Sequence, residues 1–270
     1  MEDFLVSVII PCYNQGGFLT ECVDSVLSQS YRNIEIIIVD DGSTDNTAII
    51  SKDLCSKDSR IFYEYKENGG LPSARNYGLS RAKGQFFLPL DSDDKLSPEY
   101  IERGVRVLNS NSTISLYNTN AIVFGNINQK WKLSYLGYKY ILMGNTMLPT
   151  ALYRTEDVRK IGGYDEFLRK GCEELEFFIR FLYQNDRIFH DDDYLFYYRK
   201  WGNNTMSTSA YSTNKKELFD YIYKKHIDKY VEYFGTPIEM LNSYSWAERK
   251  LPQLAKKIQQ WCQTIKDKLH

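Results

Sequence analysis

The sequence lacks any paired arrangement of cysteines. Its 270 residues include five cysteines, and no two of them form a C-x-x-C pair. An odd number of widely spaced cysteines is typical neither of a disulfide-stabilised secreted domain nor of a structural zinc site. The cysteine pattern therefore indicates a reducing compartment, and we expect a cytoplasmic protein.

Long hydrophobic runs and a strong net charge are also absent. No stretch approaches the roughly 20 consecutive apolar residues that a membrane-spanning helix needs. The N-terminal apolar run ends at Pro11, and Glu2 and Asp3 stand where a secretory signal would carry basic residues. Because the net charge is -1, nucleic acid is not an expected partner. The sequence predicts a soluble protein that is at most peripheral at the inner face of the membrane.

Short β-branched runs alternate with helical patterns, which is typical of an α/β fold with a parallel sheet. In the first half we expect strands at 6–11, 34–40, 61–65 and 85–90. Helices are expected at 18–28, 45–55, 73–82 and 97–109. Capping of the second and third helices is expected from Ser43, Thr44 and Ser73. In the second half we expect short strands at 115–124, 130–135 and 194–199, and helices at 155–161 and 173–183.

Polar motifs follow these strands where open α/β sheets bind ligands. They are Pro11-Cys12-Tyr13-Asn14, Asp40-Asp41-Gly42-Ser43-Thr44-Asp45, Asn68-Gly69-Gly70 with Ala74-Arg75-Asn76, and Asp91-Ser92-Asp93-Asp94. Together these motifs resemble the family 2 glycosyltransferases over about residues 4–205. The resemblance implies a Rossmann-like glycosyltransferase A fold with a mostly parallel central sheet in residues 1–212. Residues 1–110 would bind nucleotide sugar and metal, and 111–212 would form the acceptor side.

The acidic motif carries the strongest chemical signal. Asp91, Asp93 and Asp94 lie within four residues at the end of an apolar strand, so they repel one another unless a cation compensates them. Mn²⁺ and Mg²⁺ bind sparse carboxylate sites of this kind. We expect Asp91 and Asp93 to hold Mn²⁺ or Mg²⁺. The alternative is a solvated acidic turn before a helix.

Two residues after the first strands suit a nucleotide base. The ring of Tyr13 can stack on a base, and the carboxylate of Asp41 can accept a hydrogen bond from an imide N–H. The alternative is that this loop only ends a strand and caps a helix. The resemblance extends the donor site to other members of the motifs: Pro11, Asn14, Arg75, Asp91 and Ser92. Arg75 would face the donor diphosphate, and the alternative is a solvated surface arginine.

Residues 171–176 resemble the family segment in which an Asp supplies the catalytic base, and Glu174 occupies the position of that Asp. Helical spacing places Glu174 on one face with Phe178, whereas Glu176 can pair with Arg180 in solvent. Partial burial would raise the pKa of Glu174 toward values useful for a general base. The alternative is an acidic first turn that only compensates the helix dipole.

The resemblance implies an inverting, metal-dependent glycosyltransferase of polysaccharide biosynthesis. It would move a sugar, most simply from a UDP-sugar, to a hydroxyl of a glycan or lipid-linked saccharide. Glu174 in place of Asp, and Trp201 where many relatives have His, favour a catalytically inactive nucleotide-sugar-binding module as the alternative. A nucleotidyltransferase is disfavoured because the sequence lacks a lysine-bearing glycine-rich loop at its N-terminus.

Residues 213–270 are expected to form a helical appendage. From residue 215 onward the chain holds eleven Lys or Arg and seven Asp or Glu, together with Trp246 and Trp261. A basic, aromatic-rich helical segment favours docking on an anionic membrane surface or a role in acceptor access. The alternative is a homodimer interface or a pair of helices that covers the catalytic domain.

Overall fold

The structure is a computed structural model that describes residues 4–144, 147–183, 187–200, 206–236 and 239. The chain divides into two compact units, residues 1–219 and 220–270. The boundary expected at 212/213 falls inside helix α8 (Met206–Lys225). All the residues that we expect to form the site belong to the first unit. No helix among the described residues is both long enough and apolar enough to span a bilayer.

The first half of the central sheet is parallel. Strand β1 (Val6–Cys12) pairs with β2 (Ile34–Asp40) on one side and with β4 (Phe86–Pro89) on the other, and β3 (Ile61–Tyr65) extends the sheet beyond β2. Every residue of β1 and β2 is buried, because helices cover both faces of these strands. The four strands predicted in this half are therefore confirmed.

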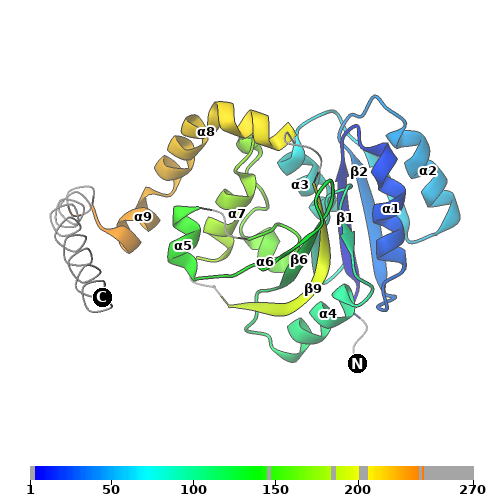
Figure 1. Ribbon diagram of the computed structural model, residues 1–270, viewed down its shortest axis with the longest axis horizontal. Coiled ribbons are helices and arrows are strands. Elements are labelled where there is room, and N and C mark those ends of the chain that lie inside the picture. The colour runs from blue at the N-terminus through cyan, green and yellow to red at the C-terminus, as the bar shows by residue number, and fades with distance from the viewer. Residues whose placement is uncertain (1–3, 145–146, 184–186, 201–205, 237–238, 240–270) are drawn as a thin grey trace, which may run out of the picture. The chain divides into compact units, whose positions relative to one another are not determined.

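Three helices flank these strands: α1 (Gly16–Leu27), α2 (Thr47–Lys57) and α3 (Leu71–Arg81). Helices α1 and α2 lie on one side of β1 and β2, and α3 lies on the other (Figure 1). On the first side, Val8 and Ile10 of β1 share an apolar core with Leu19 and Val23 of α1. The pattern of alternating strands and helices has produced the expected layers.

The expected caps of two helices are wrong. Ser43 and Thr44 are not the cap of α2, whose N-cap is Asn46 and whose first amide, that of Thr47, donates to the carboxylate of Asp45. Helix α3 begins before Ser73, with Gly70 as its N-cap and a proline in its first turn. Proline in the first turn of a helix costs no backbone hydrogen bond, so α3 can begin before Ser73.

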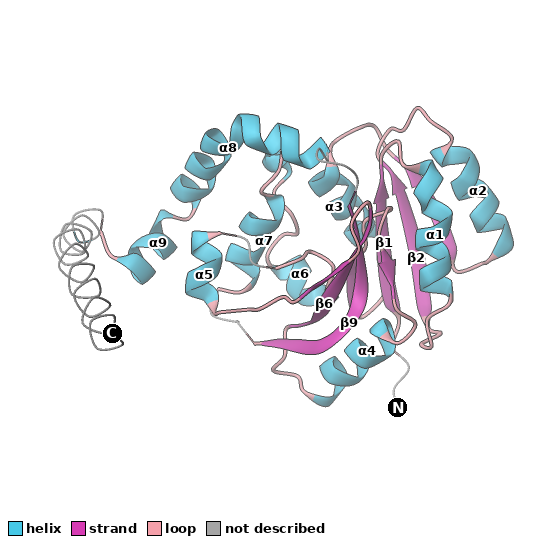
Figure 2. Ribbon diagram, in the orientation of Figure 1, coloured by secondary structure: helices cyan, strands magenta, loops and turns pink. Residues whose placement is uncertain are grey.

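The second half of the sheet is mixed. The sheet order is β3-β2-β1-β4-β8-β6-β9-β5, and β7 pairs with β6. Its strands are β5 (Lys95–Leu96), β6 (Leu116–Gly125), β7 (Gln129–Trp131), β8 (Leu152–Arg154) and β9 (Ile188–Lys200). Strand β8 joins the halves by pairing antiparallel to both β4 and β6. The long β9 curves beneath the helices of this half (Figure 2). Strands β5 and β8 were not predicted, and β7 ends at Trp131, within the strand expected at 130–135.

The remaining described helices are α4 (Tyr100–Ser110), α5 (Tyr138–Met143), α6 (Thr155–Lys160), the 3₁₀ turn Glu166–Leu168, α7 (Glu173–Phe181), α8 and α9 (Ile227–Phe234). Helix α7 begins at the residue predicted from the sequence. Of the expected appendage, the structure describes the end of α8 and α9, and its two tryptophans lie outside the described residues.

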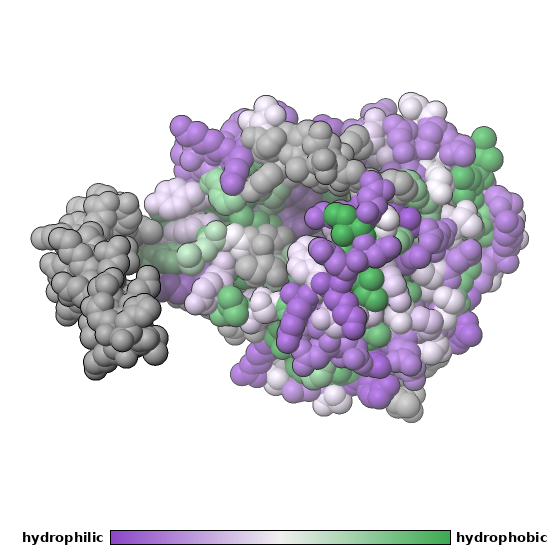
Figure 3. Space-filling view, viewed as in Figure 1, coloured by the Kyte–Doolittle hydropathy of each residue, from purple (hydrophilic) through white to green (hydrophobic). Residues whose placement is uncertain are grey.

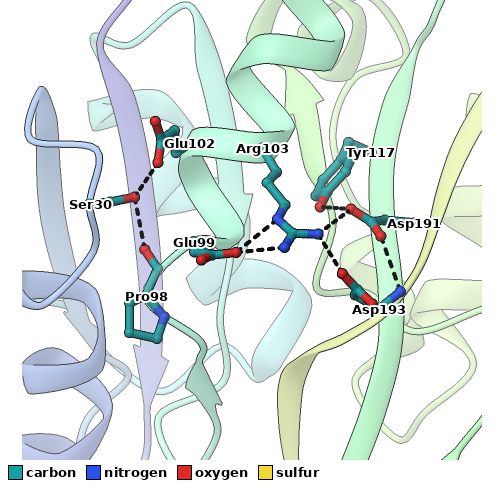
Figure 4. A network of polar contacts seen from close by, with 8 residues as sticks. All are labelled: Ser30, Pro98, Glu99, Glu102, Arg103, Tyr117, Asp191 and Asp193. Atoms are coloured by element: carbon teal, nitrogen blue, oxygen red, sulfur yellow. Dashed lines mark hydrogen bonds and ion pairs between the residues drawn. The ribbon is translucent and has the colours of Figure 1, made fainter.

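A polar network fixes α4 to the edge of the sheet (Figure 4). Arg103 of α4 forms ion pairs of 2.6 Å with Glu99 and with Asp193 of β9. It also contacts Asp191, which accepts a hydrogen bond of 2.9 Å from the hydroxyl of Tyr117 on β6. This network ties together the strands that lead to the pocket described below.

Helix α3 approaches the sheet closely because it carries Gly78. A Cβ at this position would clash with Cγ2 of Ile9 and lie 3.3 Å from Cγ2 of Val39. We therefore expect Gly78→Ala to lower the free energy of unfolding by about 1–3 kcal/mol, the usual cost of overpacking. The control is Gly17→Ala in α1, where a Cβ meets no atom within 4 Å. It should raise stability by about 0.5–1 kcal/mol, because alanine favours the helix. Urea unfolding of both variants tests this, and equal stabilities would contradict it.

Candidate active site

The carboxyl ends of β1, β2 and β4 open onto a pocket of about 600 Å³. This is the edge of the sheet at which α/β folds bind ligands, as the sequence predicts. Five of the predicted site residues line the pocket: Pro11, Tyr13, Asp41, Asp91 and Asp93. The face shown in Figure 3 is mostly hydrophilic with scattered apolar residues, rather than one continuous apolar patch.

Tyr13 and Asp41 meet in the pocket as predicted. Tyr13 is 39% exposed and lines the pocket, so its ring is accessible to a base. Asp41 is buried, and the backbone amides of Gly69 and Gly70 donate to its two carboxylate oxygens at 2.9 and 2.7 Å. Lys66 forms a 2.6 Å ion pair with the same carboxylate. These donors fix the orientation of Asp41 at the pocket wall.

Two predicted donor-binding residues, Asn14 and Ser92, form hydrogen bonds to neighbouring loops. The side-chain oxygen of Asn14 accepts a hydrogen bond of 2.8 Å from the amide of Thr44. Asn14 has a positive φ of 53°, a conformation that asparagine tolerates. The hydroxyl of Ser92 is buried and donates to the side chain of Gln15. Both residues therefore shape the loops around the pocket and do not belong to its described lining.

Arg75 is fully buried beneath the acidic groups rather than exposed to the pocket. Its guanidinium donates a hydrogen bond of 2.8 Å to Asp91 and lies 3.6 Å from a carboxylate oxygen of Glu173 and 3.5 Å from one of Glu174. Its carbon Cζ lies 5.3 Å from the ring centre of Tyr164. This arginine therefore holds the three carboxylates in place. Removal of one partner of a buried ion pair commonly lowers the free energy of unfolding by about 3–5 kcal/mol. Direct contact of Arg75 with a diphosphate stays a prediction.

Glu173 and Glu174 stand at the start of α7, where Glu173 approaches Nη1 of Arg75 and Glu174 approaches Nη2. Burial, followed by the negative charge of Glu173, raises the pKa of Glu174 to about 8, although 24% of its side chain is exposed. Burial also raises the pKa of Glu173, whose side chain is 9% exposed and which lines the pocket. A raised pKa makes a carboxylate a stronger proton acceptor, so this pair has the chemistry of a general base. Sequence reasoning gave Glu173 no role.

The backbone before α7 is set by Cys172, which has a left-handed φ of 65°. A non-glycine residue in this region is uncommon and marks a constrained turn. The turn begins the helix with both glutamates directed toward Arg75. No residue pattern in the sequence predicts this conformation of Cys172.

Glu176 and Arg180 form the expected pair, but the prediction that the pair lies in solvent is wrong. The two side chains do pair at 2.6 Å, but Glu176 is fully buried. Arg180 also donates to the carbonyl groups of Ile161 and Gly163. This pair therefore anchors α7 to the preceding turn, because α7 is covered on the face that carries Glu176.

The two predicted metal ligands have the chemistry of a divalent-cation site. Burial and repulsion from Asp91 raise the pKa of Asp93 to about 6, as expected of crowded carboxylates. The described residues contain no cluster of three or more His, Cys, Asp or Glu ligands. The two carboxylates would leave the remaining positions to water and phosphate oxygens, which is how Mn²⁺ and Mg²⁺ are commonly held beside a nucleotide.

Tertiary structure brings further basic residues and an aromatic residue to the pocket. Arg169, Tyr198 and Arg199 line the pocket. Arg199 is engaged, because its guanidinium pairs with Glu21 and donates a hydrogen bond to the carbonyl of Asp93. It thereby ties the acidic loop to β9. These residues come from segments far from the acidic motif in the sequence, and the tertiary structure brings them to the same pocket. Trp201 lies outside the described residues.

Comparison with known proteins identifies related chains. The family model described as glycosyl transferase family 2 matches residues 7–170. An uncharacterized glycosyltransferase of Rickettsia typhi is 32% identical over 242 residues, which cover 83% of this chain and 72% of that protein. The chain covers only 15% to 35% of the length of several other curated relatives.

Solved structures share the fold. S. aureus TarS in complex with UDP-GlcNAc is similar with a TM-score of 0.66 and 22% identity, over 84% of this chain and 72% of that chain. A mannosyltransferase of Pyrobaculum calidifontis in complex with GDP-Man and Mn²⁺ is similar with a TM-score of 0.61 and 14% identity, over 96% and 80% of the two chains. These similarities confirm the predicted α/β fold of the glycosyltransferase A type.

Proposed function

The chain belongs to glycosyl transferase family 2, and from this premise we propose that it transfers a sugar from a UDP-sugar to a hydroxyl group of a glycan or lipid-linked saccharide, with inversion of the anomeric carbon. The observation that carries the proposal is the position of Arg75. Its buried guanidinium contacts Asp91 of the expected metal site and Glu174, the expected base, which are far apart in the sequence. Arg75 thereby holds the residue expected to bind the metal and the residue expected to act as the base close to one another.

Each residue has a task in this proposal. Glu174 accepts the proton of the acceptor hydroxyl as its oxygen attacks the anomeric carbon, and Glu173 raises the basicity of Glu174 by its negative charge. Arg75 keeps Glu173, Glu174 and Asp91 in fixed positions by its contacts with all three carboxylates. Asp91 and Asp93 would hold a divalent cation, which would supply positive charge to the departing nucleotide diphosphate. Because attack and departure occur on opposite faces, one displacement inverts the configuration.

Uracil is the base that we propose, on two grounds. The carboxylate of Asp41 suits an imide N–H, and the similar TarS was solved with UDP and with UDP-GlcNAc. Guanine also has an N–H of this kind, and the similar mannosyltransferase binds GDP-Man. Thermal unfolding with a panel of nucleotide sugars and Mn²⁺ decides between them, since a ligand of the native state raises its apparent stability. A larger shift with GDP-sugars than with UDP-sugars would contradict the choice of uracil.

A donor-binding module without transfer activity is the second candidate, and it is favoured by Glu174 in place of the usual Asp. Release of free sugar or formation of a glycoside from the donor identified above excludes it. Docking on an anionic membrane surface through residues 215–270 stays part of the proposal. Co-sedimentation with anionic vesicles at low and high salt tests it, and binding that is absent at both salt concentrations favours the interface or covering alternative.

A further inference from the structure

An exposed tryptophan lies next to the pocket wall. Strand β7 is an exposed edge strand, and its last residue, Trp131, is 38% exposed. The ring of Trp131 meets that of Tyr198 on β9 edge to face, with their centres 5.8 Å apart and their planes at 66°. Tyr198 in turn lines the pocket. The two rings therefore form a continuous aromatic surface that runs from the pocket onto the outside of the sheet.

Backbone pairing holds both rings on the same face. On β6, Ala121 is opposite Trp131 and Val123 is opposite Tyr198. Residues two apart on a strand project to the same side, and directly paired residues share that side. Alanine opposite Trp131 leaves room for the large ring. The aromatic surface is thus built on strands and not on a mobile loop, so little conformational entropy is lost when a ligand covers it.

The aromatic pair adjoins the reacting groups. Tyr198 lines the same pocket as the expected metal ligands, Asp91 and Asp93, and as Glu173, the neighbour in sequence of the expected base Glu174. A molecule that lies across Tyr198 and Trp131 can extend one of its hydroxyl groups toward Glu174.

The chemistry of these rings fits a sugar. A pyranose has a face of C–H groups whose hydrogens are slightly positive, and the face of an aromatic ring is slightly negative. Tryptophan and tyrosine supply such faces at low entropy cost. We propose that Trp131 and Tyr198 form the acceptor subsite, in which the pyranose ring of a saccharide acceptor stacks on Trp131 and presents a hydroxyl to Glu174. The inference rests on the proposed function and assigns the acceptor chemistry of that site.

Binding of simple pyranosides tests the inference. Methyl β-D-glucopyranoside and methyl N-acetyl-β-D-glucosaminide are titrated into the 270-residue chain with saturating UDP and Mn²⁺, and binding is followed by saturation-transfer NMR. In the wild-type protein, saturation should be strongest at the ring hydrogens on one face of the sugar. Trp131→Ala should weaken binding about tenfold, which corresponds to the upper range of aromatic contributions. Trp131→Phe should keep most of the affinity.

Two further variants separate stacking from other effects. Trp131→Leu keeps apolar bulk and protects the fold but removes the aromatic face, so it should lose affinity like the alanine variant. Phe62→Ala removes another exposed ring, 42% exposed, on β3 at the opposite end of the sheet order, and it should bind the pyranosides as the wild type does. UDP affinity should be equal in all variants.

Each contrary outcome has a distinct meaning. Unchanged pyranoside binding in the alanine and leucine variants overturns the subsite, as does the absence of pyranoside binding to a wild-type protein that binds UDP. A loss of UDP-sugar affinity without a loss of pyranoside affinity would assign the rings to the donor instead and also overturns it. Failure of the wild-type protein to bind any nucleotide sugar would refute the proposed function, while the pyranoside titration would still report on the aromatic pair.

Discussion

Glu174→Gln should reduce the rate of sugar transfer by at least about 10² to 10⁴, the usual contribution of a positioned general base. The amide keeps the size of the side chain but does not accept the proton of the acceptor hydroxyl. Binding of UDP and Mn²⁺ should hardly change, because Arg75 keeps its 2.8 Å hydrogen bond to Asp91. Initial transfer rates and UDP titrations of the two proteins, with the identified donor and acceptor, measure both effects.

Glu173→Gln is the matched variant, since it alters the other glutamate beside Arg75. It removes the charge that helps to raise the pKa of Glu174, so the rate should fall less than in Glu174→Gln. A near-wild-type rate in Glu174→Gln together with collapse in Glu173→Gln would place the base at Glu173. Glu176→Gln is not a neutral control. Its carboxylate is fully buried against Arg180, so this change should instead lower the free energy of unfolding.

Asp93→Ala should abolish the metal-dependent part of UDP binding while the fold stays intact. One of two proposed carboxylate ligands is removed, and a site that relies on so few protein ligands should not hold the cation with one of them missing. In the metal-free protein the substitution also removes a carboxylate whose pKa is raised by burial and by Asp91. The variant should therefore be at least as stable as the wild type.

Calorimetric titration of UDP with and without Mn²⁺, together with thermal unfolding, measures these effects. The control is Asp53→Ala, which removes an exposed carboxylate on α2 that pairs only with Lys57 across one helical turn among the described residues. That variant should bind UDP as the wild type does. Equal stimulation by Mn²⁺ in Asp93→Ala and in the wild type would refute the assignment of Asp93 as a ligand.

By itself, the sequence determined the first half of the fold and the edge at which the site forms. The β-branched runs of β1 and β2 are buried on both faces, so their hydrophobic pattern depends on few partners and is readable locally. The motifs that hold Tyr13, Asp41, Asp91 and Asp93 directly follow strands, and all four residues line the pocket. Their grouping follows from parallel strands ending at one edge.

Only the tertiary structure decided what surrounds these residues. It buried Arg75 beneath three carboxylates, joined Asn14 and Ser92 to neighbouring loops by hydrogen bonds, and brought Tyr198 into the pocket that the acidic loop lines. The pairing of Glu176 with Arg180 was readable from helical spacing, but its burial was not, because burial depends on what packs against the helix. Contacts between segments about 100 residues apart are set by sheet order and strand pairing, and no local pattern of residues encodes them.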